Sequence, residues 1–170
     1  MPVPAMSPPT DAALGSLALQ LAERMLAGSW HLVTAESCTG GWIAKAVTDL
    51  AGSSGWFEAG LVTYSNQAKI RLLGVSPATL ERHGAVSEAT VREMVAGALA
   101  ATEAEMAVAV TGIAGPGGAT PGKPVGSVWI GWQRRGAEAV ARLYRFEGDR
   151  EAVRRLTVQK ALQGLLASID

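Results

Sequence analysis

The chain has 170 residues, 48% of them hydrophobic, and its 15 basic residues balance its 15 acidic ones. This length supports one domain with a sizeable buried core, and the balanced charge argues against general binding to nucleic acid. The single cysteine, Cys38, excludes an internal disulfide and a cysteine-rich zinc site, which favours a reducing, cytoplasmic setting. His31 and His83 lack the spacing of a metal site.

Residues 1–9 are rich in proline and lack the basic segment of a signal peptide, so we expect a flexible lead-in there. Residues 10–170 are expected to form a single domain, since no linker or repeat interrupts them. No apolar run approaches the roughly 20 residues that span a membrane. We therefore expect a soluble protein.

Helices and strands alternate along most of the chain. Apolar spacing, capping residues and glycine stops predict helices at about 11–28, 40–52, 66–74, 76–84, 87–102 and 150–167. Short β-rich runs predict strands at 31–36, 59–65, 106–112, 125–133 and 139–147, the last two joined as a hairpin. This pattern predicts a three-layer α/β/α sandwich with a mixed, largely parallel sheet.

The stretch TAESCTGGW, residues 34–42, puts Ser37 after a predicted strand and before a predicted helix. Ligands of open α/β sheets bind beyond the carboxyl ends of the strands, so Ser37 is a candidate nucleophile. The N–H groups of Cys38, Thr39 and Gly40 are candidate donors to an oxyanion. Gly40 and Gly41 would let a ligand approach the backbone. The alternative is structural: Ser37 or Thr39 caps the helix, and the glycines serve packing.

A serine nucleophile needs a base, and VTYSNQAK offers one at the end of another predicted strand. A lysine desolvated there has a depressed pKa, so Lys69 is a candidate amine base. The Tyr64 hydroxyl is a candidate to relay a proton or to orient that amine. The alternatives are a surface charge for Lys69 and core packing for Tyr64.

A third motif, TGIAGPGG at residues 111–118, also follows a strand. Its glycine-rich backbone can present N–H groups to an anion, with Lys123 as a nearby cation. It lacks the GK[ST] ending of a P-loop and the GxGxxG pattern, so a turn without a ligand is the alternative. In a parallel sheet the three motifs would share one edge.

With these motifs, the chain resembles the CinA C-terminal domain family, the nicotinamide mononucleotide amidohydrolases, in a stand-alone form. The resemblance extends from about residue 10 to 167 and rests on AESCTGGWIAKAVTDLAGSSGWF, GLVTYSNQAKIRLLGV, GAVSEATVREM, VTGIAGPGG, GKPVGSVWI and FEGDR.

The resemblance implies hydrolysis of the carboxamide of nicotinamide mononucleotide to nicotinic acid mononucleotide and ammonia, with no metal and no organic cofactor. It implies that Ser37 is the nucleophile, Lys69 the base, Tyr64 a further catalytic residue and Thr111 a neighbour of the reacting group. Cys38 is a competing nucleophile.

The candidate site as a whole has two parts. The catalytic residues are Ser37, Tyr64 and Lys69, and the substrate-binding residues are Cys38, Thr39, Gly40, Gly41, Thr111, Gly112, Gly115, Gly117 and Arg150. Arg150 is a candidate for the phosphate, with pairing to Asp149 or Glu147 as the alternative.

Two other functions stand beside this one: an amidase for a different small amide, and a non-catalytic nucleotide-binding module linked to competence or the DNA-damage response. Five tryptophans and a high apolar content favour self-association, with a homodimer or higher homo-oligomer expected.

Overall fold

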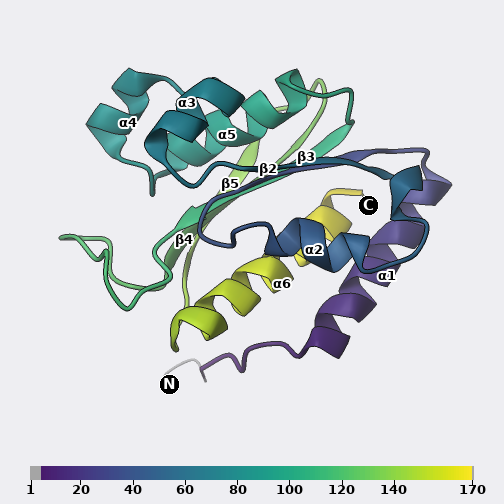
Figure 1. Cartoon of the computed structure of the whole chain (residues 1–170), viewed down its shortest axis with the longest axis horizontal. Coiled ribbons are helices and arrows are strands. Elements are labelled where there is room, and N and C mark those ends of the chain that lie inside the picture. Colours follow the sequence, from purple (N-terminus) through teal and green to yellow (C-terminus); the bar gives the residue numbers. More distant parts are fainter. Residues whose placement is uncertain (1–4, 170) are drawn as a thin grey trace.

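The computed structural model of the chain describes residues 5–169 and is built around a five-stranded sheet (Figure 1). In chain order the strands are β1 Leu32–Glu36, β2 Phe57–Val62, β3 Met106–Gly112, β4 Ser127–Arg134 and β5 Val140–Arg145, and their order across the sheet is β2-β1-β3-β4-β5. The first three strands are parallel, while β4 and β5 form the predicted hairpin and run antiparallel. The sheet is therefore mixed, as the sequence predicts.

Helices cover both faces of the sheet, which confirms the three-layer prediction (Figure 1). One layer holds α1 Asp11–Ala27, α2 Trp42–Thr48 and α6 Arg150–Ile169. The other holds α3 Asn66–Leu73, α4 Pro77–His83 and α5 Glu88–Ala100, and a 3-10 turn, Ser53–Gly55, precedes β2.

The two faces of the sheet carry different side chains, because β3 alternates large and small residues. Met106, Val108 and Val110 belong to the core on the α1, α2 and α6 side, while alanines face α5. Helix α3 then packs tightly against α5, since a Cβ at Gly97 would lie 1.8 Å from the Leu73 carbonyl oxygen. This contact fixes the helix that carries Lys69.

The parallel strands end in register. Glu36 at the end of β1 is paired with both Val62 of β2 and Val110 of β3. The chain therefore leaves all three strands at one edge of the sheet, directly before or within each of the three motifs. Ligand sites of open α/β sheets lie at this edge.

Strand β2 ends earlier than the sequence predicts, at Val62 instead of residue 65. The reason is local: Ser65 caps α3, and its Oγ accepts a hydrogen bond from the Ala68 N–H at 3.0 Å. An N-cap residue already belongs to the helix entry, so Tyr64 lies on a connecting segment and not within the strand.

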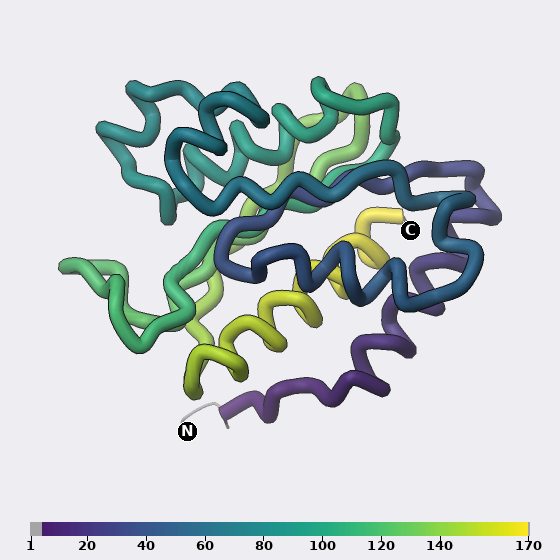
Figure 2. Tube along the Cα trace, viewed as in Figure 1, coloured from purple at the N-terminus to yellow at the C-terminus, as the bar shows by residue number. Residues whose placement is uncertain are grey.

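The expected lead-in lies partly outside the described residues, which begin at residue 5. From there to Thr10 the chain has no regular structure, and Thr10 caps α1. Pro9 is buried, and its carbonyl accepts a hydrogen bond from Arg155 at 3.3 Å. Figure 2 shows this purple segment beside the start of α6. No helix between residues 5 and 169 is long and apolar enough to cross a membrane.

Candidate active site

A cavity of about 250 Å³ lies at the carboxyl edge of the parallel strands. It is lined by residues from all three motifs, from the segment before α5 and from the start of α6: Ser37, Cys38, Tyr64, Asn66, Lys69, Ala85, Val86, Thr111, Gly112, Ile113, Ala114, Gly115, Gly117, Gly118 and Arg150. The three motifs that the sequence assigns to one edge thus meet around a single cavity.

Ser37 and Lys69 are in direct contact within this cavity. The Lys69 Nζ lies 3.0 Å from the Ser37 Oγ, although the two residues are 32 positions apart in the chain. Lys69 is 1% exposed and Ser37 is 8% exposed. The interpretation of Lys69 as a surface charge is therefore wrong. The Ser37 hydroxyl is hydrogen-bonded to an amine that is sheltered from water.

Burial lowers the pKa of Lys69. No acidic side chain within residues 5–169 forms an ion pair with the ammonium; its other partners are the main-chain oxygens of Thr63 at 2.8 Å and Tyr64 at 3.4 Å. A neutral amine has two N–H groups and one lone pair. When the two carbonyls take the N–H groups, the lone pair faces the Ser37 hydroxyl, as a proton acceptor requires.

Cys38 also lines the cavity, but its environment suppresses thiolate formation. Burial and the nearby Glu36 carboxyl raise the pKa of its thiol to about 12. At neutral pH almost none of this thiol is ionised, and the thiolate is the nucleophilic form. The comparison with Ser37, which touches a basic amine, favours the serine as nucleophile.

The turn after β1 is held by a buried carboxyl group. Glu36 accepts hydrogen bonds from the Thr39 hydroxyl at 2.6 Å and from the N–H groups of Ile43 at 2.8 Å and Ala44 at 3.1 Å. Glu36 therefore caps α2, and the interpretation of Ser37 or Thr39 as the cap is wrong. Burial raises the pKa of Glu36, against the effect of these hydrogen bonds.

The hydrogen bonds of the turn decide which N–H groups remain available for an oxyanion. The Gly40 N–H donates to the Ser37 carbonyl at 3.0 Å, so the expectation that it is a free donor is wrong. The N–H groups of Cys38 and Thr39 have no acceptor in the described part of the chain. These two are the remaining candidates for an oxyanion site.

Three predicted substrate-binding residues do not line the cavity with Ser37. Thr39, Gly40 and Gly41 lie along a separate hollow beside Trp42 and Arg154. The glycines have φ angles of +62° and +102°, which L side chains rarely adopt. In the structure they shape the turn instead of lining the cavity.

Tyr64 and Arg150 meet at the mouth of the cavity. The Arg150 guanidinium donates to the Tyr64 hydroxyl at 3.0 Å and to the Gly115 carbonyl at 2.9 Å. Tyr64 is 60% exposed, so the core-packing alternative is wrong. Its hydroxyl is bonded to Arg150, and it is the Tyr64 carbonyl that contacts the Lys69 amine. Arg150 forms no ion pair with Asp149 or Glu147 among the described residues.

The loop after β3 closes the cavity from the other side. Thr111 is buried, and its hydroxyl donates to the Ala85 carbonyl at 2.8 Å, which leaves the oxygen able to accept. The predicted glycines Gly112, Gly115 and Gly117 line the cavity with it. Lys123 does not line this cavity: its Nζ donates to the His83 carbonyl at 2.8 Å.

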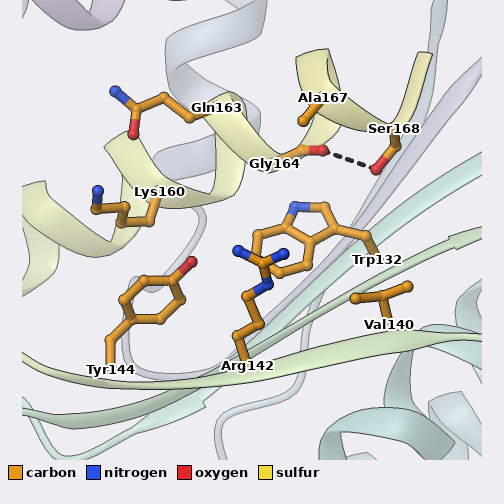
Figure 3. A pocket seen from close by; sticks show the side chains of 9 residues that line it. All are labelled: Trp132, Val140, Arg142, Tyr144, Lys160, Gln163, Gly164, Ala167 and Ser168. Carbon is orange, nitrogen blue, oxygen red and sulfur yellow. Dashed lines mark hydrogen bonds between the residues drawn. The ribbon is translucent and has the colours of Figure 1, made fainter. Parts of the chain in front are cut away.

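A larger hollow of about 460 Å³ lies between β5 and the C-terminal half of α6 (Figure 3). Its walls include Trp132, Arg142, Tyr144 and Lys160. Among the residues that line it, Ser168 is the one serine or cysteine. Its hydroxyl donates to the Gly164 carbonyl at 2.7 Å and not to a basic side chain. The smaller cavity is therefore the candidate active site. Residues 5–169 hold no cluster of three or more metal-binding side chains.

The sequence did not indicate three polar residues of the site region. Glu36 was visible directly before Ser37, and its position at a helix start was the available signal. Asn66 lines the cavity from the first turn of α3. Arg154 contacts the turn from α6, and only its place one turn after Arg150 hinted at this.

The fold and the site define an α/β protein with a buried serine–lysine pair at the carboxyl edge of its parallel strands. The chain belongs to the family of the CinA C-terminal domain, whose model matches residues 14–169. It is 51% identical over 156 residues to the nicotinamide-nucleotide amidohydrolase PncC of Escherichia coli (strain K12), covering 92% of this chain and 94% of the relative.

Other relatives agree with this assignment. The nicotinamide-nucleotide amidohydrolase PncC of Pseudomonas putida is 53% identical over 151 residues, or 89% of this chain and 94% of the relative. The crystal structure of the competence/damage inducible protein CihA from Agrobacterium tumefaciens superposes with a TM-score of 0.90 at 43% identity, covering 94% of this chain and 96% of that one.

Proposed function

We infer that this chain is a nicotinamide-nucleotide amidohydrolase, which converts nicotinamide mononucleotide to nicotinic acid mononucleotide and ammonia. The relatives that it matches over nine-tenths of its length carry this name. The observation that carries the chemistry is the 3.0 Å contact between the Ser37 Oγ and the Lys69 Nζ in a sheltered cavity. The compartment that fits this reaction and the single unpaired cysteine is the cytoplasm.

In the first half of the reaction, neutral Lys69 takes the hydroxyl proton as the Ser37 Oγ bonds to the carboxamide carbon. The negative charge moves to the carboxamide oxygen, which the N–H groups of Cys38 and Thr39 are placed to stabilise. The carbon–nitrogen bond then breaks, and the Lys69 ammonium returns its proton to the leaving nitrogen, so that ammonia departs. An acyl group remains on Ser37.

In the second half, water replaces ammonia. Lys69 accepts a proton from the water as the water oxygen bonds to the acyl carbon. The ester bond to Ser37 then breaks. The proton on Lys69 passes back to the serine oxygen, which restores the enzyme and releases the carboxylic acid. One lysine thus acts first as base and then as acid, and both roles require its pKa to lie near the working pH.

The nucleotide would enter with its nicotinamide ring toward Ser37 and its phosphate at the mouth. Arg150 lies at that mouth beside Tyr64. Its guanidinium suits bidentate binding of a phosphate. The glycine-rich loop lines the same cavity, and its Gly115 carbonyl accepts a hydrogen bond from Arg150 at 2.9 Å. We therefore assign the phosphate to Arg150 and the loop at 113–118, and not to Lys123.

Mass spectrometry of the product tests this function. Nicotinamide mononucleotide should gain about one mass unit as NH₂ becomes OH, with one ammonia per product. Free nicotinamide and asparagine should react far more slowly, because they lack the phosphate that Arg150 would bind. Ser37→Ala should lower kcat by at least about 10⁴-fold, as loss of a serine nucleophile does elsewhere, with an unchanged circular dichroism spectrum.

The results separate the alternatives. Equal turnover of asparagine or nicotinamide would indicate an amidase for another substrate. Nucleotide binding without ammonia release by the wild-type chain would indicate the non-catalytic module. The expected homodimer is a separate proposal, and the mass measured by light scattering tests it.

A further inference from the structure

Arg154 of α6 is bonded to the turn that carries Ser37. Its Nε donates to the Cys38 carbonyl at 3.1 Å, and its second terminal nitrogen donates to the Thr39 carbonyl at 3.0 Å. The guanidinium also lies over the Trp42 ring, 5.2 Å from the ring centroid. One cation from a helix more than a hundred residues away thus fixes two successive peptide groups, 38–39 and 39–40, which begin one residue after the nucleophile.

The direction of one N–H group follows from this contact. In a trans peptide the C=O and N–H point in opposite directions. Because the Cys38 carbonyl faces Arg154, the Thr39 N–H of the same peptide group is directed away from the guanidinium. Thr39 is 1% exposed, yet this N–H has no acceptor within residues 5–169. A buried N–H without an acceptor is rare in proteins and calls for a ligand or water.

We propose that Arg154 is a positioning residue: it holds the Cys38–Thr39 peptide so that the Thr39 N–H stabilises the oxyanion formed when Ser37 attacks. This inference rests on the proposed amidase function. Arg154 does not line the cavity and acts only through the turn. Its charge also polarises the peptide group that it binds, which strengthens the N–H on the other side as a donor.

The turn is then held from two sides, by the Glu36 carboxyl group and by the Arg154 guanidinium. Glu36 accepts from the Thr39 hydroxyl and from the first N–H groups of α2, while Arg154 donates to the carbonyls. Donors fixed before the reaction do not reorganise when charge develops, and this is the main source of their catalytic effect. An arginine suits this position because its planar fork reaches two carbonyls at once, whereas a lysine offers one point charge.

Kinetics of Arg154 variants test the proposal. Arg154→Ala should lower kcat by about 10- to 100-fold and leave KM within about twofold, because an oxyanion donor acts mainly in the transition state. Arg154→Lys should fall between Arg154→Ala and the wild type. Guanidinium ion added at millimolar concentration should restore part of the kcat of Arg154→Ala. The acid limb of the pH profile, set by Lys69, should stay where it is in the wild type.

Arg155 provides a matched control. Its guanidinium also lies over the Trp42 ring, at 4.9 Å, but its side chain bonds to Asp11, Glu151 and Pro9 instead of the turn. Arg155→Ala should keep kcat within about twofold of the wild type, as expected for a side chain outside the reaction. An equal loss of kcat in Arg155→Ala and Arg154→Ala would overturn the proposal, because the effect would then come from packing around Trp42.

The remaining outcomes are also decisive. If Arg154→Ala is poorly folded by circular dichroism, Arg154→Lys and Arg154→Gln carry the test. Full kcat in any folded variant that lacks the guanidinium, or a raised KM with unchanged kcat, would overturn the positioning role while leaving the amidase function intact. A wild-type chain without turnover would instead remove the proposed function and this inference together.

Discussion

Two of the hollows in the described part of the chain differ in chemistry more than in size. The one between β5 and α6 is the larger, at about 460 Å³ against about 250 Å³. Its cations, Arg142 and Lys160, sit on an open face beside aromatic rings (Figure 3). The smaller cavity holds Lys69, which is 1% exposed and bonded to a serine.

The difference teaches how a site is identified from structure. A solvated cation costs the fold little, whereas a buried lysine without a carboxylate costs stability and persists only where it is used. Volume alone does not select the candidate active site.

The largest effect is expected for Lys69→Met, which removes the base and keeps the volume. Its kcat should fall by about 10³-fold or more, since general acid–base catalysis is worth up to about 10⁴-fold and the serine is inert without it. The variant should be at least as stable as the wild type at pH 7, because a buried amine is replaced by an apolar side chain. Thermal unfolding measures the predicted stability, and ammonia release measures the predicted loss of kcat.

The stability difference should depend on pH with a defined sign. The native pKa of Lys69 is lowered, so between that value and the unfolded value of about 10.4 the unfolded chain binds more protons. The free energy of unfolding of the wild type should therefore rise with pH across that window, and the advantage of Lys69→Met should shrink toward about pH 10. Glu36 is common to both chains and cancels. A variant that is less stable than the wild type and equally so at every pH would contradict this account.

An intermediate effect is expected for Arg150→Ala at the mouth of the cavity. KM for nicotinamide mononucleotide should rise by about tenfold or more, the worth of a hydrogen bond to a charged group, with a smaller change in kcat. The loss should disappear for nicotinamide riboside, which has no phosphate. If KM rises equally for both substrates, Arg150 does not bind the phosphate.

The smallest effect is expected in the larger hollow. The double variant Arg142→Ala, Lys160→Ala should keep kcat/KM within about twofold of the wild type, because neither side chain lines the cavity that holds Ser37. A tenfold loss or more would show that this hollow takes part in catalysis and would break the comparison.

The sequence predicts the meeting of Ser37 and Lys69 because a general rule connects these distant residues. Ser37 and Lys69 were placed together because parallel strands end at one edge, and the structure brings them to 3.0 Å. The same rule could not tell which face of a turn meets the cavity. Gly40 and Gly41 therefore fell on the other side, and the Gly40 N–H is used within the turn itself.

Contacts set by helix packing were beyond the sequence. Arg154 donates to the Cys38 carbonyl although the two residues are 116 positions apart in the chain. This contact depends on how α6 packs against α2. The shorter β2 had a local cause, the capping of α3 by Ser65. Periodicity thus predicts the elements and their order. Helix caps decide where the elements end, and helix packing decides which side chains, such as Arg154, contact the turn beside the site.

The most direct test of the central claim is a titration of the lysine side chains by NMR with ¹³C-labelled lysine. The chain has four lysines, and Lys69→Met identifies the signal of interest. Lys69 should titrate below the usual value of about 10.4, with Lys45, whose pKa is raised by Asp49, above it. If Lys69 titrates at or above the usual value of about 10.4, it is charged at neutral pH, and a neutral amine cannot be the base for Ser37.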